Sequence, residues 1–337
     1  MGWISQAGES WTTLFGGTWL RAAAQSWLPL AHVKWFTTAT PESPAPLAEV
    51  LNITFLAGAG LTILAALGLT LLNLPLQELG WVRRLHAALD RFQPHHLWML
   101  RVGMALPLIL AGLDGYLFHY ELVAIPGWMR WTQLLLGVAL LVPASSRAAA
   151  AGVGLLYLGG MLAVGVHPLL DYLSWLGAAY YLAVEGKRGA LPVLYIATGL
   201  SLSWAAVEKW VYPGLSLDIL SREPIPTFGF EPHQFLILAG WVELGVGYLL
   251  ITGVLNRFLS LVVTLIFVLT SSLFGGREII GHWQLHAALL LFLAMGTGRH
   301  ITPVLWHRGR ALQLAFVGVT LAPFVAGLLL LYYQLAP

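Results

Sequence analysis

The sequence predicts an all-α fold, a polytopic bundle of about ten transmembrane helices, on two observations. Of the 337 residues, 58% are apolar and 9% are charged, whereas soluble proteins average about 45–50% apolar and about 25% charged residues. The apolar residues also recur in stretches close to the length of about 20 residues that a bilayer-spanning helix requires. This composition excludes a soluble enzyme, a disordered regulator and a nucleic-acid-binding domain.

The expected spans follow one another along most of the chain. Charged residues concentrate between them, because a charge in the hydrocarbon core is costly. In chain order, we expect spans at 50–76, 99–118, 131–146, 148–166, 168–184, 190–211, 233–253, 257–275, 281–296 and 312–333.

The 17 Lys and Arg residues are unequally distributed between the two sets of connections. Six lie on one side, and the other 11 are Arg83, Arg84, Arg91, Arg101, Arg147, Lys187, Arg188, Arg257, Arg299, Arg308 and Arg310. Cytoplasmic loops carry the excess of Lys and Arg. The sequence therefore predicts a multi-pass protein of the cell (cytoplasmic) membrane with both termini outside.

Two segments outside the spans also have recognisable patterns. Residues 1–48 form an outer segment, in which the aromatic-rich stretch 11–36 predicts an interfacial helix. Residues 212–232 form the longest outer loop, where four prolines favour extended and turn geometry. The absence of cysteine excludes disulfides, thiolate metal sites and iron–sulfur ligation.

An internal repeat organises the central part of the chain. The stretch 131–147 matches 241–257, with the initial Trp and the final Arg in register. Extending the match gives the pairs Asp114/Glu208, Gln133/Glu243, Arg147/Arg257, His167/His282 and Asp171/His286.

The repeat divides the chain into two four-helix units, 97–188 and 189–298. Because each unit has an even number of spans, both have the same orientation and the repeat is parallel. The flanking regions are 49–96, with the first transmembrane helix and a cytoplasmic loop, and 299–337, with the C-terminal transmembrane helix. Alternating-access transporters also use parallel repeats.

Each unit resembles the DoxX-like four-helix membrane module, including the DoxD-like proteins related to the large subunit of thiosulfate:quinone oxidoreductase. The second unit carries the clearer match. Its matching residues are Thr198-Gly199-Leu200, Glu208-Lys209-Trp210, Pro213, Gly240-Trp241-Val242-Glu243-Leu244-Gly245-Val246-Gly247, Gly253, Arg257 and Gly281-His282. The resemblance implies a tandem duplication of this module and a role in quinone-linked oxidoreduction, without assigning catalytic residues.

Ionisable residues within the spans are the candidate site, because burying them in a membrane is costly unless they serve a function. We expect them in the outer half of the bilayer. The candidate catalytic residues, from three helices of the second unit, are Glu208, Glu243, His282 and His286. The candidate substrate-binding residues around them are Lys209, His233, Asp114, His167 and Asp171.

Three interpretations of this site are open. Histidine and a paired carboxylate can exchange protons with a quinone headgroup. Glu208, Glu243, His282 and His286 are also a set of ligands that suits a bound metal ion such as Fe, Mn, Zn or Cu. The third interpretation is a structural hydrogen-bond network that holds the helices together.

Three functions follow from these interpretations, and whether the protein is an enzyme stays open. The first is a membrane subunit of a quinone-linked redox system, with quinone or metal as the candidate cofactor. The sequence has no recognisable flavin, iron–sulfur or haem motif, so this function requires an extracytoplasmic or membrane redox partner. The second is a non-catalytic anchor or assembly scaffold for a redox complex, and the third is a transporter of a small anion or metal ion.

Overall fold

The computed structural model describes residues 37, 43–119, 122, 125–187, 189–274, 276–298 and 300–336. Within them the regular structure is helical and no strand occurs, which confirms the all-α prediction. The interfacial helix expected at 11–36 lies outside the described residues.

The described helices follow one another with short connections. They are α2 (Leu47–Val50), α3 (Ile53–Glu78), α4 (Gly80–Asp90), the 3₁₀ helix η1 (Gln93–His95), α5 (His96–Asp114), α6 (Gly127–Leu141), α7 (Ser146–Val164), α8 (Val166–Leu170), α9 (Leu173–Ala183), α10 (Ala190–Val211), α11 (Pro213–Arg222), α12 (Pro232–Thr252), α13 (Asn256–Phe274), α14 (Gly276–Met295), α15 (Pro303–Trp306) and α16 (Arg310–Leu335).

Six helical stretches among the described residues are long and apolar enough to cross a membrane: α3, α4 with α5, α7, α10, α12 and α16. The other ranges expected to span are helical as well, but their described apolar helices are shorter. For example, α6 has 15 residues and α9 has 11. The structure therefore supports a helical membrane bundle in a lipid environment, but it does not support the expected number of ten membrane spans.

Two local differences from the sequence prediction have simple physical causes. Residues 213–222 of the expected outer loop form α11, because Pro213 occupies the first helical position, where its missing N–H costs nothing. The expected span at 168–184 is divided into α8 and α9 by a turn at Asp171 and Tyr172. Gly165 has φ +94°, a conformation that favours glycine, and separates α7 from α8.

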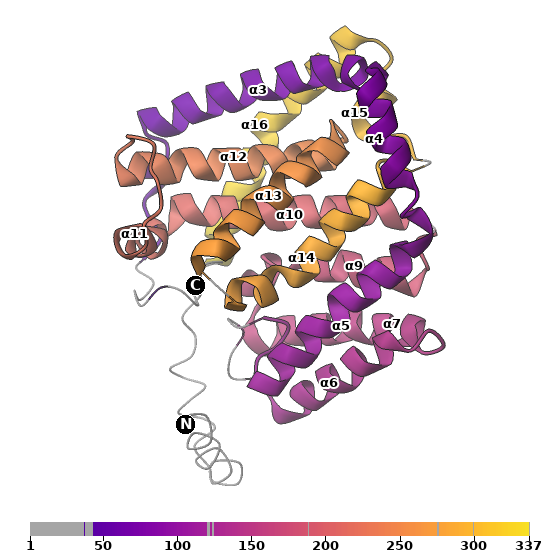
Figure 1. The fold of residues 1–337 in the computed structure, drawn as a ribbon. Helices are drawn as coiled ribbons and strands as arrows, with labels where there is room; N and C mark the ends of the chain where they lie inside the picture. Colours follow the sequence, from indigo (N-terminus) through magenta and orange to yellow (C-terminus); the bar gives the residue numbers. More distant parts are fainter. Residues whose placement is uncertain are drawn as a thin grey trace.

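The helices of the two sequence units pack across the boundary between them (Figure 1). Helix α5 packs on α6 and also on α14, whereas α10 packs on α12 and also on α9. Helices α10 and α14, although both belong to 189–298, contact each other only marginally. The second unit is therefore not a separate, closed four-helix bundle.

The two ends of the bundle differ in character. Helices α4 and α15 lie at one end and α11 lies at the other (Figure 1). The connections at the α4 end carry most of the described Lys and Arg residues, and we call it the basic end: Arg83, Arg84, Arg91, Arg147, Lys187, Arg257, Arg308 and Arg310.

Helices α10 and α12 approach each other closely at a pair of glycines. A Cβ atom on Gly247 would lie 2.5 Å from the carbonyl oxygen of Gly199, and one on Gly199 would lie 2.5 Å from the carbonyl oxygen of Gly247. Two backbones can approach this closely only where neither residue has a side chain. The small residues therefore set the separation of the two helices.

We expect Gly247→Ala to lower the free energy of unfolding by about 1–3 kcal/mol, because the new methyl group must push a backbone carbonyl away. Gly60→Ala in α3 is the matched control, since no atom lies within 4 Å of the added Cβ. It should stabilise the protein by up to about 1 kcal/mol through helix propensity. The measurement is unfolding in detergent, and equal effects of the two substitutions would contradict this account of the interface.

Candidate functional site

A group of buried and half-buried polar side chains lies at the end of the bundle opposite the basic end. We call it the polar cluster and define it as His167, Asp171, Glu208, Lys209, Glu243 and Tyr332. Its members come from α8, from the turn that follows α8, and from α10, α12 and α16. Asp171 and Glu208 are 4% and 2% exposed, and Tyr332 is fully buried. Carboxyl groups at such depth are rare in an apolar bundle.

Three carboxyl groups of the polar cluster share one ammonium group. Lys209 Nζ donates a hydrogen bond to Glu243 Oε2 at 2.6 Å and another to the carbonyl oxygen of Ala205 at 3.3 Å. Lys209 also interacts electrostatically with Glu208 and Asp171. Within the polar cluster, lysine can therefore balance only part of the charge that three ionised carboxylates would carry.

Aromatic rings pack against one another at the polar cluster. The ring of Tyr332 lies 4.7 Å from that of His167 and 4.6 Å from that of Trp204, measured between centroids. Tyr332 interacts electrostatically with both Glu208 and Asp171. An imidazole, a phenol and carboxyl groups are thus placed around one another in a setting of low polarity. All three group types can donate or accept a proton.

A second group, the histidine group, consists of His119, Tyr172, Phe267, His282 and His286. The ring of His282 stacks on Phe267 at 4.7 Å and lies 6.3 Å from that of His119, which stacks on Tyr172 at 5.0 Å. His286 lies edge-on to Phe267 at 5.7 Å. His119 had not been singled out in the sequence, where no repeat partner or spacing marks it.

The four expected catalytic residues are thus divided between two sets of contacts. Glu208 and Glu243 belong to the polar cluster, whereas His282 and His286 belong to the histidine group. The reason is the packing across the unit boundary, since α14 packs on α5 and α13 while α10 packs on α9 and α12. Asp171 and Tyr172 are consecutive, so the turn between α8 and α9 contributes one residue to each group.

A buried hydrogen-bond network joins the helices that carry the two groups. Ser174 Oγ in α9 donates to Gln284 Oε1 in α14 at 3.0 Å, and the backbone N–H of Ser174 donates to Ser201 Oγ in α10 at 2.9 Å. Small uncharged polar residues such as these are common in membrane helices. For that reason, sequence reasoning missed them.

The remaining expected residues lie in different surroundings. Asp114 is exposed at the C-terminal end of α5, unlike its repeat partner Glu208, and His233 is half-buried in the first turn of α12. Gln133, the repeat partner of Glu243, is fully buried and makes three hydrogen bonds to backbone groups of 108–118. These bonds satisfy the amide and indicate a structural role for Gln133.

In the described part of the chain, no three His, Asp or Glu side chains are grouped so that they could hold a metal ion. Glu243 directs its carboxylate to Lys209 instead of to a histidine. The geometry thus gives no support to the metal-ligand interpretation of Glu208, Glu243, His282 and His286.

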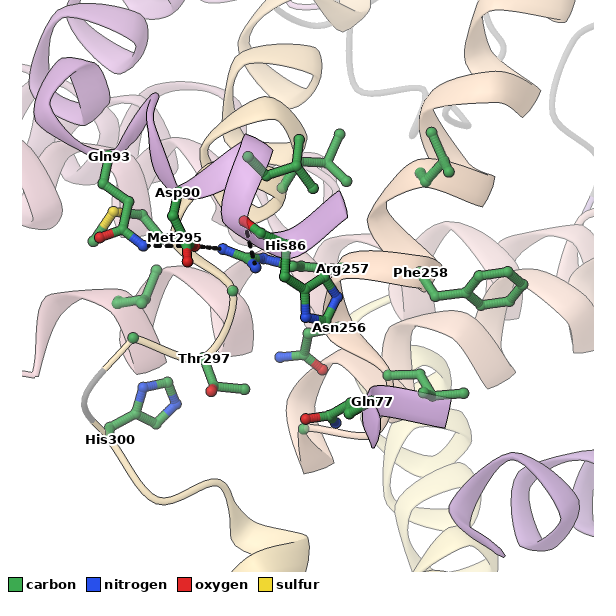
Figure 2. Close-up of a pocket in the computed structure, with 18 of the residues that line it drawn as sticks. Gln77, His86, Asp90, Gln93, Asn256, Arg257, Phe258, Met295, Thr297 and His300 are labelled. Atoms are coloured by element: carbon green, nitrogen blue, oxygen red, sulfur yellow. Dashed lines mark hydrogen bonds and ion pairs between the residues drawn. The ribbon is translucent and has the colours of Figure 1, made fainter. Parts of the chain in front are cut away.

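A cavity of about 910 Å³ lies at the basic end, and of the repeat-paired residues Arg257 lines it. It is lined by α4, by the first turns of α10 and α13, and by the C-terminal end of α14 (Figure 2). Its polar lining includes His86, Asp90, Asn256, Arg257 and His300. Burial lowers the pKa of His300 below its ordinary value, which favours the neutral imidazole at neutral pH.

A comparison of this chain with protein-family models, curated proteins and solved structures finds no significant match. The resemblance to DoxX-like modules therefore stays a prediction from the motifs quoted above.

We expect Lys209→Met to destabilise the protein by about 1–3 kcal/mol, because the Glu243 carboxylate would stay largely buried without its cation. The two side chains are 17% and 20% exposed, so water offsets part of the loss. The double variant Lys209→Met/Glu243→Gln should regain most of the stability. A double-mutant cycle of unfolding in detergent measures the coupling, and purely additive effects would show that the pair contributes nothing.

Proposed function

We propose that the protein is a membrane subunit of a quinone-linked redox system, and that the polar cluster binds a quinone headgroup or exchanges its protons. The observation that carries this proposal is the convergence of Asp171, Glu208 and Tyr332 from separate segments of the chain onto buried, neighbouring positions. Ionisable groups inside a membrane protein are costly and commonly mark proton relays or substrate sites. A quinone takes up protons when it is reduced, and these groups are suited to supply them.

The grouping of proton-exchanging side chains supports proton exchange in particular. The three carboxyl groups of the polar cluster lie around the ammonium group of Lys209. His167 lies beside Tyr332 and gives the polar cluster a second proton carrier. Electrons would come from an extracytoplasmic or membrane partner, because the sequence carries no recognisable redox-centre motif.

The same proposal includes the ten spans, the outer location of the polar cluster and the tandem repeat. Packing supports the repeat. Under the sequence match of the two units, the contact of α5 with α14 corresponds to the contact of α10 with α9. In the same way, the contact of α7 with α9 corresponds to the contact of α13 with α14. Such an exchange of neighbours is what a two-fold relationship between parallel units would produce. The distribution of Lys and Arg supports a cytoplasmic basic end.

A scaffold for a redox complex is the second candidate function. The Ser174–Gln284 and Gln133 hydrogen bonds favour it, because buried networks whose members are satisfied hold helices in a defined arrangement. A transporter of a small anion or metal ion has no comparable observation in its favour.

We expect Glu208→Gln and Asp171→Asn to weaken quinone binding by about tenfold or more, the cost of losing a hydrogen bond to a charged or proton-exchanging group. Asp114→Asn is the matched control, since Asp114 is the repeat partner of Glu208 but is exposed. Binding of decylubiquinone to the protein in nanodiscs is measured by quenching of tryptophan fluorescence.

Size-exclusion profiles and unfolding temperatures of the three variants separate loss of binding from loss of folding. If Glu208→Gln and Asp171→Asn fold and bind decylubiquinone like the wild type, or if the wild type does not bind it, the redox proposal fails. The scaffold is then preferred, and uptake of an ion by vesicles that contain the protein would favour the transporter.

A further inference from the structure

Helix α4 lies across the basic end of the bundle as a separate amphipathic helix. Figure 1 shows it running transverse to α3 and α10, and the 3₁₀ helix η1 separates it from α5. Helix α5 alone has 19 residues, close to the length that a bilayer-spanning helix requires. The stretch of α4 with α5 can therefore cross the membrane through α5, while α4 lies along the membrane surface.

One face of α4 is apolar and only partly covered by protein. Trp81, Val82, Leu85 and Leu89 recur at helical spacing, and all four line the cavity at the basic end. Val82 is buried, whereas Trp81 and Leu85 are 58% and 44% exposed. Large apolar side chains that stay exposed beside a cavity mark a surface that another apolar group covers.

The apolar face of α4 meets an exposed apolar strip on α13. Phe258 and Leu261 belong to this strip, and they line the cavity opposite α4. Leu265 and Leu269 continue it at intervals of four residues and are also exposed. Residues four apart lie on the same face of a helix. Acyl chains of the surrounding bilayer can therefore follow α13 from the membrane-facing surface of the bundle to the apolar face of α4.

The opposite face of α4 is basic. Arg83, Arg84 and Arg91 are exposed, and helical geometry places them on the side of α4 away from Leu85. None of the ion pairs among the described residues involves these three arginines. The only acid of α4, Asp90, pairs with Arg257 instead. The arginine face of α4, defined by these three residues, therefore presents three accessible positive charges.

We propose that α4 is an interfacial helix whose arginine face binds acidic phospholipid headgroups of the leaflet at the basic end. The headgroups lie outside the cavity, beside the arginines, and the apolar face of α4 rests on the acyl chains of the same lipids. Basic amphipathic helices next to membrane spans recognise acidic lipids. A lipid is favoured over a soluble protein partner, because the apolar face of α4 continues into the membrane-facing strip of α13. This proposal does not depend on the polar cluster or on the proposed redox role.

The test places a fluorescent label on the apolar face of α4 and measures which lipid reaches it. The chain has no cysteine, so Leu85→Cys provides a single site for a bimane label. The labelled full chain is reconstituted into phosphatidylcholine vesicles with a small fraction of phosphatidylglycerol or phosphatidylcholine that carries a nitroxide on its acyl chain. The labelled phosphatidylglycerol should quench bimane about fivefold more strongly than the labelled phosphatidylcholine, the preference that one cation beside an acidic surface contributes.

Two double variants of the labelled protein remove the same amount of charge and test the arginine face. Arg83→Gln/Arg84→Gln should lower the preference for phosphatidylglycerol by about fivefold. Arg147→Gln/Lys187→Gln is the matched control and should keep the preference, since both residues lie at the basic end but outside α4. All four side chains are exposed, so both variants should fold like the wild type, which size-exclusion profiles check.

A label at Leu162→Cys is the positional control. Leu162 is 92% exposed on α7, towards the end of that helix away from the basic end, and there the two lipids should quench equally. Equal quenching by the two lipids at Leu85→Cys, or equal effects of the two double variants, would overturn the proposal. Quenching by both lipids at Leu162→Cys but by neither at Leu85→Cys would show that a protein partner, and not lipid, covers α4.

Discussion

The pairing of buried polar groups in an apolar bundle is the constraint on which the rest of this structure depends. Helices α10 and α12 approach each other at Gly199 and Gly247, and near the other end of their contact Lys209 reaches Glu243. Close backbone contact brings the two charged side chains within bonding distance. The ion pair in turn makes any other register of the two helices costly, because sliding one along the other would leave a charge unbalanced in a setting of low polarity.

The exchange of neighbours across the sequence boundary decides which polar residues meet. Because α10 packs on α9 and α14 packs on α5, residues of 97–188 and 189–298 line common spaces. The polar cluster draws on α8, α10, α12 and α16, and the histidine group draws on α13, α14 and the segment that contains His119. A site of this kind belongs to the whole bundle, and a single four-helix unit would hold only part of it.

Several features could be predicted from the sequence because they depend on short-range or additive properties. Composition and apolar stretches predicted the helical membrane bundle, and the burial cost of ionisable residues drew attention to Glu208 and Asp171. Helix α11 was missed because prolines at 213, 224, 226 and 232 were all interpreted as turn residues, whereas Pro213 starts a helix. His119 was missed because no motif or repeat marks it. The basic-end cavity was missed because Arg257, although paired with Arg147 in the repeat, is joined there by residues far apart in the sequence.

The sequence by itself determined that the chain forms apolar helices, where most of them begin and end, and that a few acids and histidines lie within them. Only the tertiary structure decided that Glu208 lies with Asp171 and Tyr332, that His282 and His286 lie with Phe267, and that a polar-lined cavity forms between α4 and the ends of α10, α13 and α14. The physical reason is that the propensity and hydrophobicity of a segment are properties of its own residues. The partners of a buried side chain are instead set by which helices pack together, and apolar helix surfaces of similar composition do not encode that choice locally.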